Sequence, residues 1–176
     1  MPIENERKYV INETSESLFA QHAEKTLHID QKYLAINKGF STRVRSINNC
    51  RFILTVKQDV QGMIGQLEIE TEISKEDFEI LWKTAYRVIS KIRYVYKGWE
   101  IDFFKNEQGK NYIAVAEIEL PPKIKWPEVI PQIIKENIIY VVPIEDKRFS
   151  NKKIGNIKYA SKLLEHVKHA YKKIRG

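Results

Sequence analysis

The sequence IENERKYV, residues 3–10, has the alternation of a β-strand, and it decides how the rest of the chain is interpreted. Successive side chains of a strand point to opposite faces, so Glu4, Glu6 and Lys8 share one face. Two carboxylates and one ammonium group are thereby brought together. A motif this short can arise by chance in a charged protein, so its weight depends on the later segments.

Charged residues alternate with apolar ones in most of the other segments that resemble strands. The acidic positions are Glu68, Glu70, Glu72, Glu100, Asp102, Glu117 and Glu119, and the basic positions are Arg43, Arg45, Lys57, Lys91 and Arg93. An antiparallel sheet with one solvated face also alternates, and for any single pair this is the better interpretation. Like charges two apart on a strand repel each other, however, so their recurrence in several strands favours an ion-binding site.

The same alternation predicts an α+β fold in one domain over residues 1–176. We expect a closed eight-stranded antiparallel β-barrel, a tunnel with a polar, charged interior, whose apolar outer faces are covered by helices. The predicted strands are residues 3–10, 33–37, 40–48, 51–57, 66–74, 91–96, 100–105 and 112–120. The predicted helices are residues 16–25, 75–86, 126–135 and 156–174.

Composition supports a globular protein that attracts anions. Of the 176 residues, 43% are hydrophobic and 30% charged, and the net charge of +7 favours anionic partners. No apolar run is long enough to cross a bilayer, and Cys50 is the only cysteine. We therefore expect a cytoplasmic protein without a membrane partner.

The residue types indicate a metal and a phosphate ligand. Carboxylates without a matching histidine or cysteine cluster favour Mg²⁺ or Mn²⁺ over zinc. Arginine offers a planar fork to phosphate oxygens, and lysine offers a mobile point charge. The sequence thus predicts a cavity that binds polyphosphate together with a hard divalent cation.

With these residues identified, the chain resembles the CYTH or triphosphate tunnel metalloenzyme superfamily, and most of all its small bacterial inorganic triphosphatases. The resemblance covers nearly the whole chain. It rests on an ordered set of motifs: Glu4-x-Glu6-x-Lys8, Gln31-x-Tyr33-Leu34, Arg43-x-Arg45, Thr55-Val56-Lys57, Glu68-x-Glu70, Lys91-x-Arg93-Tyr94, Asp102, Glu117-x-Glu119 and Glu145-Asp146-Lys147-Arg148-Phe149-x-Asn151.

The resemblance implies roles for individual residues. It implies metal binding by Glu4, Glu6, Glu117 and Glu119, with Glu68, Glu70 and Asp102 as further inner acids. It implies a grip on the triphosphate by Lys8, Arg43, Arg45, Lys57, Lys91, Arg93 and Lys147. The catalytic residues are expected to be Glu4, Glu6, Lys8 and Lys91. Because Glu72 continues the acidic alternation, the functional pair could be Glu70 and Glu72, although Glu68 and Glu70 are favoured.

The expected activity is metal-dependent hydrolysis of the terminal phosphoanhydride of tripolyphosphate or a related small-molecule triphosphate. A class IV adenylyl cyclase, which makes cyclic AMP and pyrophosphate from ATP, is the nearest alternative, followed by a thiamine or nucleoside triphosphatase. A non-catalytic binder of polyphosphate or nucleic acid is a third class. Nucleic acid is disfavoured because inward carboxylates would repel its phosphate backbone.

Overall fold

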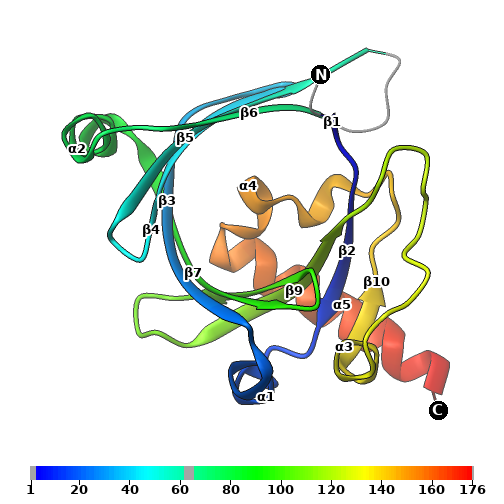
Figure 1. Ribbon diagram of the computed structural model, residues 1–176. Helices are drawn as coiled ribbons and strands as arrows, with labels where there is room; N and C mark the ends of the chain where they lie inside the picture. Colours follow the sequence, from blue (N-terminus) through cyan, green and yellow to red (C-terminus); the bar gives the residue numbers. More distant parts are fainter. Residues whose placement is uncertain (1–2, 62–65, 176) are drawn as a thin grey trace.

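The computed structural model describes residues 3–61 and 66–175 and has an α+β fold with one large antiparallel sheet (Figure 1). Ten strands are present in these two ranges, in the order β1-β6-β5-β4-β3-β7-β8-β9-β2-β10. Their bounds are β1 Ile3–Glu4, β2 Glu6–Ile11, β3 Lys25–Asn37, β4 Phe40–Ile47, β5 Arg51–Asp59, β6 Gln66–Glu72, β7 Tyr86–Tyr96, β8 Trp99–Lys105, β9 Asn111–Glu119 and β10 Ile138–Val141.

The sheet curls until its two ends meet at the N-terminal segment (Figure 1). β1 pairs with β6 and β2 pairs with β9, and Asn5 is the single residue between the two strands. Large twisted sheets curl in this way because the rotation between neighbouring strands accumulates. Across the described residues the hydrogen-bonded ladder is an open series of strands. The predicted closed barrel is therefore confirmed only as a strongly curved antiparallel sheet.

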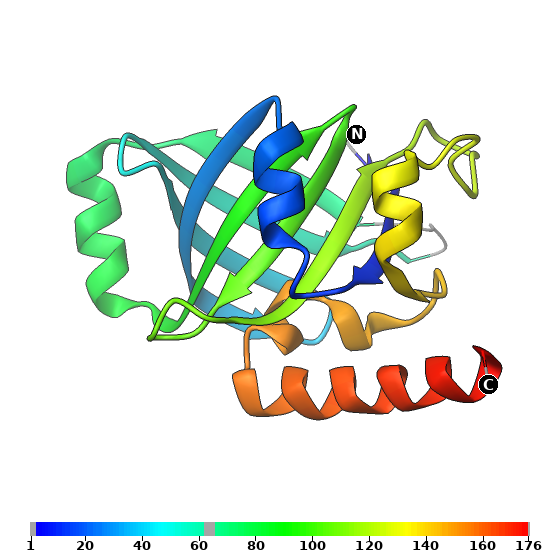
Figure 2. The same cartoon turned by 90° about the horizontal axis from the view of Figure 1, so that it is seen from below.

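Among the described residues, five helices flank the sheet: the first three cover its convex face, as the sequence predicts, and the last two lie at one end of it (Figures 1 and 2). They are α1 Glu16–His22, α2 Lys75–Thr84, α3 Gln132–Asn137, α4 Asn151–Ile154 and α5 Ile157–Arg175, with a 3₁₀ turn, η1, at Lys147–Phe149. Phe19 of α1 and Ile134 of α3 are buried against Tyr9, Trp99 and Phe103 of the sheet. No described helix is long and apolar enough to span a bilayer.

One end of the concave face is apolar, which the sequence did not lead us to expect. Val10, Ile89 and Phe104 share a face with Lys8, Lys91 and Asp102, yet they are almost fully buried in a core with α4 and α5. Figures 1 and 2 show these two helices at one end of the curved sheet. The interior is therefore charged over part of its length and closed at one end by apolar packing.

The predicted helix over residues 126–135 is largely wrong. The helix α3 starts at Gln132, with Pro131 at its N-cap. A proline disfavours helical backbone in the residue before it, and Pro127 and Pro131 apply this restriction at Trp126 and Ile130. The strand β3 is also longer than predicted, and β10 was not predicted.

Candidate functional site

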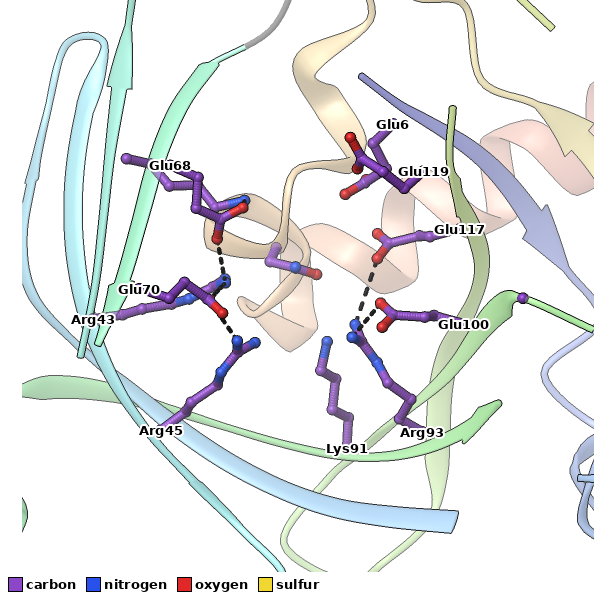
Figure 3. Close-up of a pocket in the computed structure, with 13 residues that line it drawn as sticks. Glu6, Arg43, Arg45, Glu68, Glu70, Lys91, Arg93, Glu100, Glu117 and Glu119 are labelled. Carbon is purple, nitrogen blue, oxygen red and sulfur yellow. Dashed lines mark hydrogen bonds and ion pairs between the residues drawn. The ribbon is translucent and has the colours of Figure 1, made fainter. Parts of the chain in front are cut away.

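The concave face contains a cavity of about 250 Å³ that is lined almost entirely by charged side chains (Figure 3). We call it the charged cavity. Its lining consists of Glu6, Arg43, Arg45, Lys57, Glu68, Glu70, Lys91, Arg93, Gly98, Glu100, Glu117, Glu119 and Asn151. Six glutamates thus face five basic residues in one cavity. Charges removed from water are costly unless they are paired, so the pairing within this space is informative.

On one wall, basic residues of β4 and β5 pair with acids of β6. Arg43 lies 3.4 Å from Glu68, and Arg45 lies 2.5 Å from Glu70. Lys57 reaches the other oxygen of Glu68 at 3.2 Å. These pairs follow from the register, because Thr55 of β5 lies between Arg43 of β4 and Glu70 of β6. The wall therefore presents three cations, each held in position by a carboxylate.

On the opposite wall, Asp102 of β8 holds the two basic residues of β7. Asp102 is fully buried and accepts hydrogen bonds from Arg93 at 2.6 and 2.7 Å and another from Lys91 Nζ. Burial alone would raise the pKa of Asp102, but Arg93 and Lys91 outweigh it and hold the pKa well below its usual range. Asp102 is thus an ionised anchor that fixes the direction of both cations.

The pKa of Lys91 is lowered well below the ordinary value of a lysine. Lys91 is 3% exposed, and burial, followed by repulsion from Arg93, lowers the pKa of Lys91 to about 8. The attraction of Asp102 and Glu117 only partly offsets these effects. A lysine with this pKa changes charge near physiological pH, which is unusual for an ammonium group.

An adjoining cavity of about 380 Å³ shares Glu6, Arg43, Lys57 and Asn151 with the charged cavity. Lys8 lies in this second cavity, where its Nζ pairs with both Glu6 and Glu117. Burial opposes the charged form of Lys8, yet Glu117 and Glu6 raise the pKa of Lys8 above its ordinary value. Lys8 therefore stays cationic beside the first acidic motif.

Most of the residues predicted for the site line one of these two cavities. Glu6, Arg43, Arg45, Lys57, Glu68, Glu70, Lys91, Arg93, Glu117 and Glu119 line the charged cavity, and Lys8 and Lys147 line the adjoining one. Glu68 and Glu70 enter the cavity, whereas Glu72 is exposed and pairs with Arg51 at 3.4 Å. The side chain of Glu4 lies outside the described residues.

Two predicted residues are placed differently from the others. Asp102 lies behind the lining, bonded to Lys91 and Arg93. Lys147 is exposed at the edge of the adjoining cavity, where its Nζ lies 3.2 Å from Asp59. Its ammonium group is therefore engaged by a carboxylate of β5.

Three residues that line the cavity were not predicted as site residues: Gly98, Glu100 and Asn151. Glu100 pairs with Arg93, and its burial raises the pKa of Glu100, which Arg93 only partly offsets. Its alternation with Asp102 on one strand was the signal that could have identified it. Asn151 of α4 lines both cavities; it ends the last motif of the resemblance, but it was given no role there, and it reaches the cavities through the packing of the C-terminal segment.

The residues present suit a hard divalent cation held by few protein ligands. Within residues 3–61 and 66–175, no group of three or more His, Cys, Asp or Glu side chains is positioned to hold a metal ion by itself. Glu6 and Glu119, however, lie directly opposite each other on β2 and β9, and both line the charged cavity (Figure 3). Mg²⁺ typically binds one or two carboxylates together with water and substrate phosphates, so this pair fits it.

Solved structures share the fold of this curved antiparallel sheet. The inorganic triphosphatase NE1496 is 23% identical, with a TM-score of 0.52 over 86% of this chain and 97% of that one. A putative adenylate cyclase from Bacillus halodurans is 19% identical, with a TM-score of 0.57 over 83% of this chain and 95% of that one.

A protein from Pyrococcus horikoshii is 18% identical, with a TM-score of 0.50 over 70% of this chain and 81% of that one. The sequence matches no protein-family model and no curated protein. At these identities the likeness concerns the fold, and the fold fits the resemblance to the CYTH superfamily that the motifs indicated.

Proposed function

We propose that the charged cavity binds a triphosphate and that this protein hydrolyses the terminal phosphoanhydride with the help of a divalent metal ion. The observation that carries the proposal is the convergence of five basic residues from three strands, β4, β5 and β7, on one cavity that also holds carboxylates. A solvated sheet face would direct these charges into bulk water. Enclosed cations of this number match a compact polyanion.

The basic residues that would bind the triphosphate lie on two walls of the cavity. Arg43 and Arg45 offer planar forks from one wall, and Lys91 and Arg93 face them from the other (Figure 3). Asp102 fixes Lys91 and Arg93, so little reorganisation is needed when phosphate oxygens approach. Preorganised cations of this kind stabilise the charge that develops on the transferred phosphoryl group.

Glu6 and Glu119, joined by Glu4, are the residues we assign to Mg²⁺ or Mn²⁺. When bound, such an ion neutralises phosphate charge and lowers the pKa of a coordinated water. Glu117 bonds Lys8 and also approaches Arg93 at 3.6 Å, so it links the acidic motif to the basic wall. These carboxylates argue against a simple nucleic-acid binder, since they repel phosphate unless a cation is present.

A cyclase would bind the triphosphate with the same residues, so only the reaction products distinguish cyclisation from hydrolysis. The purified protein should be incubated with tripolyphosphate, ATP and thiamine triphosphate, each with Mg²⁺, with Mn²⁺ and with excess chelator. We expect orthophosphate from tripolyphosphate, dependent on the metal. Cyclic AMP and pyrophosphate from ATP would instead establish a cyclase. Metal-independent binding without turnover would overturn the proposal in favour of a binding protein.

A further inference from the structure

The two carboxylates assigned to the metal lie where a sheet ladder is weakest. Glu6 is the first residue of β2, Glu119 is the last residue of β9, and the two are direct partners in the register. Like charges directly opposite on neighbouring strands destabilise their pairing. The ends of paired strands also open most readily. Some other contact must therefore hold these two residues together.

Asn5 supplies such contacts from its position between β1 and β2. Its backbone N–H donates to Glu119 Oε1 at 2.8 Å, and its carbonyl accepts from Leu120 N at 2.9 Å. Its side-chain Nδ2 donates to the carbonyl oxygens of Pro121 at 2.8 Å and Ile124 at 3.0 Å. Asn5 thereby fastens the loop that follows β9 to the strand that carries Glu6.

Arg7 fastens the same loop from the convex side of the sheet. Its guanidinium donates to the carbonyls of Lys125, Ile124 and Glu6, the last two at 3.2 and 2.8 Å. Arg7 is only 4% exposed, and its guanidinium lies 5.9 Å from the centre of the Trp126 ring. A buried arginine bonded to carbonyls in two segments fixes their separation, because its planar fork has little freedom.

We propose that Asn5 and Arg7 form a clamp that holds Glu6 and Glu119 in position as one cation site. Both are positioning residues, because their side chains line neither cavity. The inference rests on the proposed function, since it assigns these carboxylates to a metal ion. Beyond that function, the clamp makes the affinity for the metal ion depend on a loop on the outer side of the sheet.

The test is the binding of Mn²⁺ alone, measured as free Mn²⁺ by electron paramagnetic resonance, together with the melting temperature. Asn5→Ala keeps the backbone N–H bond to Glu119 but removes the side-chain bonds to Pro121 and Ile124. It should therefore raise the Kd for Mn²⁺ by up to about 10- to 100-fold, the range that outer partners of metal ligands typically contribute. The matched control is Asn106→Ala. Asn106 caps the β8–β9 turn by accepting from Gln108 N and Lys110 N, and it lines neither cavity.

Both alanine variants should lower the melting temperature, but Asn106→Ala should leave the Kd unchanged. If Asn5→Ala fails to fold, Arg7→Lys, which keeps the charge and loses the fork, should weaken Mn²⁺ binding in the same direction. A folded variant of either clamp residue with wild-type affinity would overturn the clamp alone. Failure of the wild-type protein to bind Mn²⁺ alone would overturn the clamp, whereas the metal dependence of phosphate release from tripolyphosphate tests the proposed function separately.

Discussion

Glu6 combines three properties that no other described acid of the site shares. It lines both cavities, it pairs with Lys8, and it lies opposite Glu119. Glu72, in contrast, has the same alternation as Glu68 and Glu70 but extends to solvent beside Arg51. The two residues offer a direct comparison between an enclosed and an exposed glutamate.

Glu6→Gln should lower the rate of phosphate release from tripolyphosphate by on the order of 10²–10³, because it removes a charged group beside the reacting centre while keeping the shape of the side chain. The matched variant Glu72→Gln should retain wild-type activity. Initial rates with saturating Mg²⁺ or Mn²⁺ provide the measurement. Equal activity of the two variants would refute the assignment of Glu6.

Lys91 should make substrate binding depend on pH. Because burial and Arg93 lower the pKa of Lys91 to about 8, its ammonium charge is present below that pH and is lost as the pH rises above it. The KM for tripolyphosphate should therefore increase as the pH rises through about 8. Lys91→Arg keeps its charge throughout this range, so its KM should stay level. Parallel pH profiles of the two proteins would contradict a role for this charge.

Sequence reasoning selected most of the residues that line the charged cavity, because alternation in strands is a local property. It assigned Arg43, Arg45, Lys91 and Arg93 to one interior face without knowing which strands are neighbours. It included Asn151 in a motif but gave it no role, since only the packing of α4 at one end of the sheet brings this residue to the cavity. Nor did it show that Asp102 accepts hydrogen bonds from Lys91 and Arg93, because those contacts depend on the register of β7 and β8.

At the scale of the elements, the sequence predicted the strands better than it predicted where the charged interior changes to an apolar core. Val10, Ile89 and Phe104 follow the same alternation as charged neighbours, yet they pack under α4 and α5. Alternation cannot show where along a strand the surroundings change from a charged cavity to an apolar core. The error over residues 126–135 has a different origin. The apolar residues there have helical spacing, but two prolines disfavour a helix in the same segment.

Gly155 provides a test of how α4 packs against the sheet. A Cβ added there would lie 2.1 Å from Ile89 Cδ1 and 2.5 Å from Ile89 Cγ1, and Ile89 is 1% exposed. Gly155 has ordinary helical backbone, so the cost of Gly155→Ala is steric. We expect a loss of about 1–3 kcal/mol in the free energy of unfolding.

The Ile89→Ala background makes this prediction specific. Removing the atoms that collide should make the additional cost of Gly155→Ala much smaller, so the two substitutions should be non-additive. Denaturant unfolding of the wild type, both single variants and the double variant measures the coupling. Additive costs would show that Ile89 and Gly155 do not meet as described.

At the scale of the whole molecule, the net charge of +7 attracts anions but does not select the place where they bind. The exposed basic residues of α5, including Lys158 and Lys162, could also attract polyphosphate. The charged cavity inside the curved sheet and the exposed lysines of α5 differ in how they would bind an anion. Cations gathered in one cavity and held by paired carboxylates bind a compact ligand in one orientation, whereas exposed lysines are screened by salt.

The central claim is that the charged cavity is the triphosphate site, and a crystal structure of the Glu6→Gln variant with tripolyphosphate and Mn²⁺ tests it most directly. The account predicts phosphate density between Arg43 and Arg45 on one wall and Lys91 and Arg93 on the other. It also predicts any anomalous manganese signal beside Glu119. Tripolyphosphate bound on the outer face of α5, with the cavity filled only by water, would contradict the account.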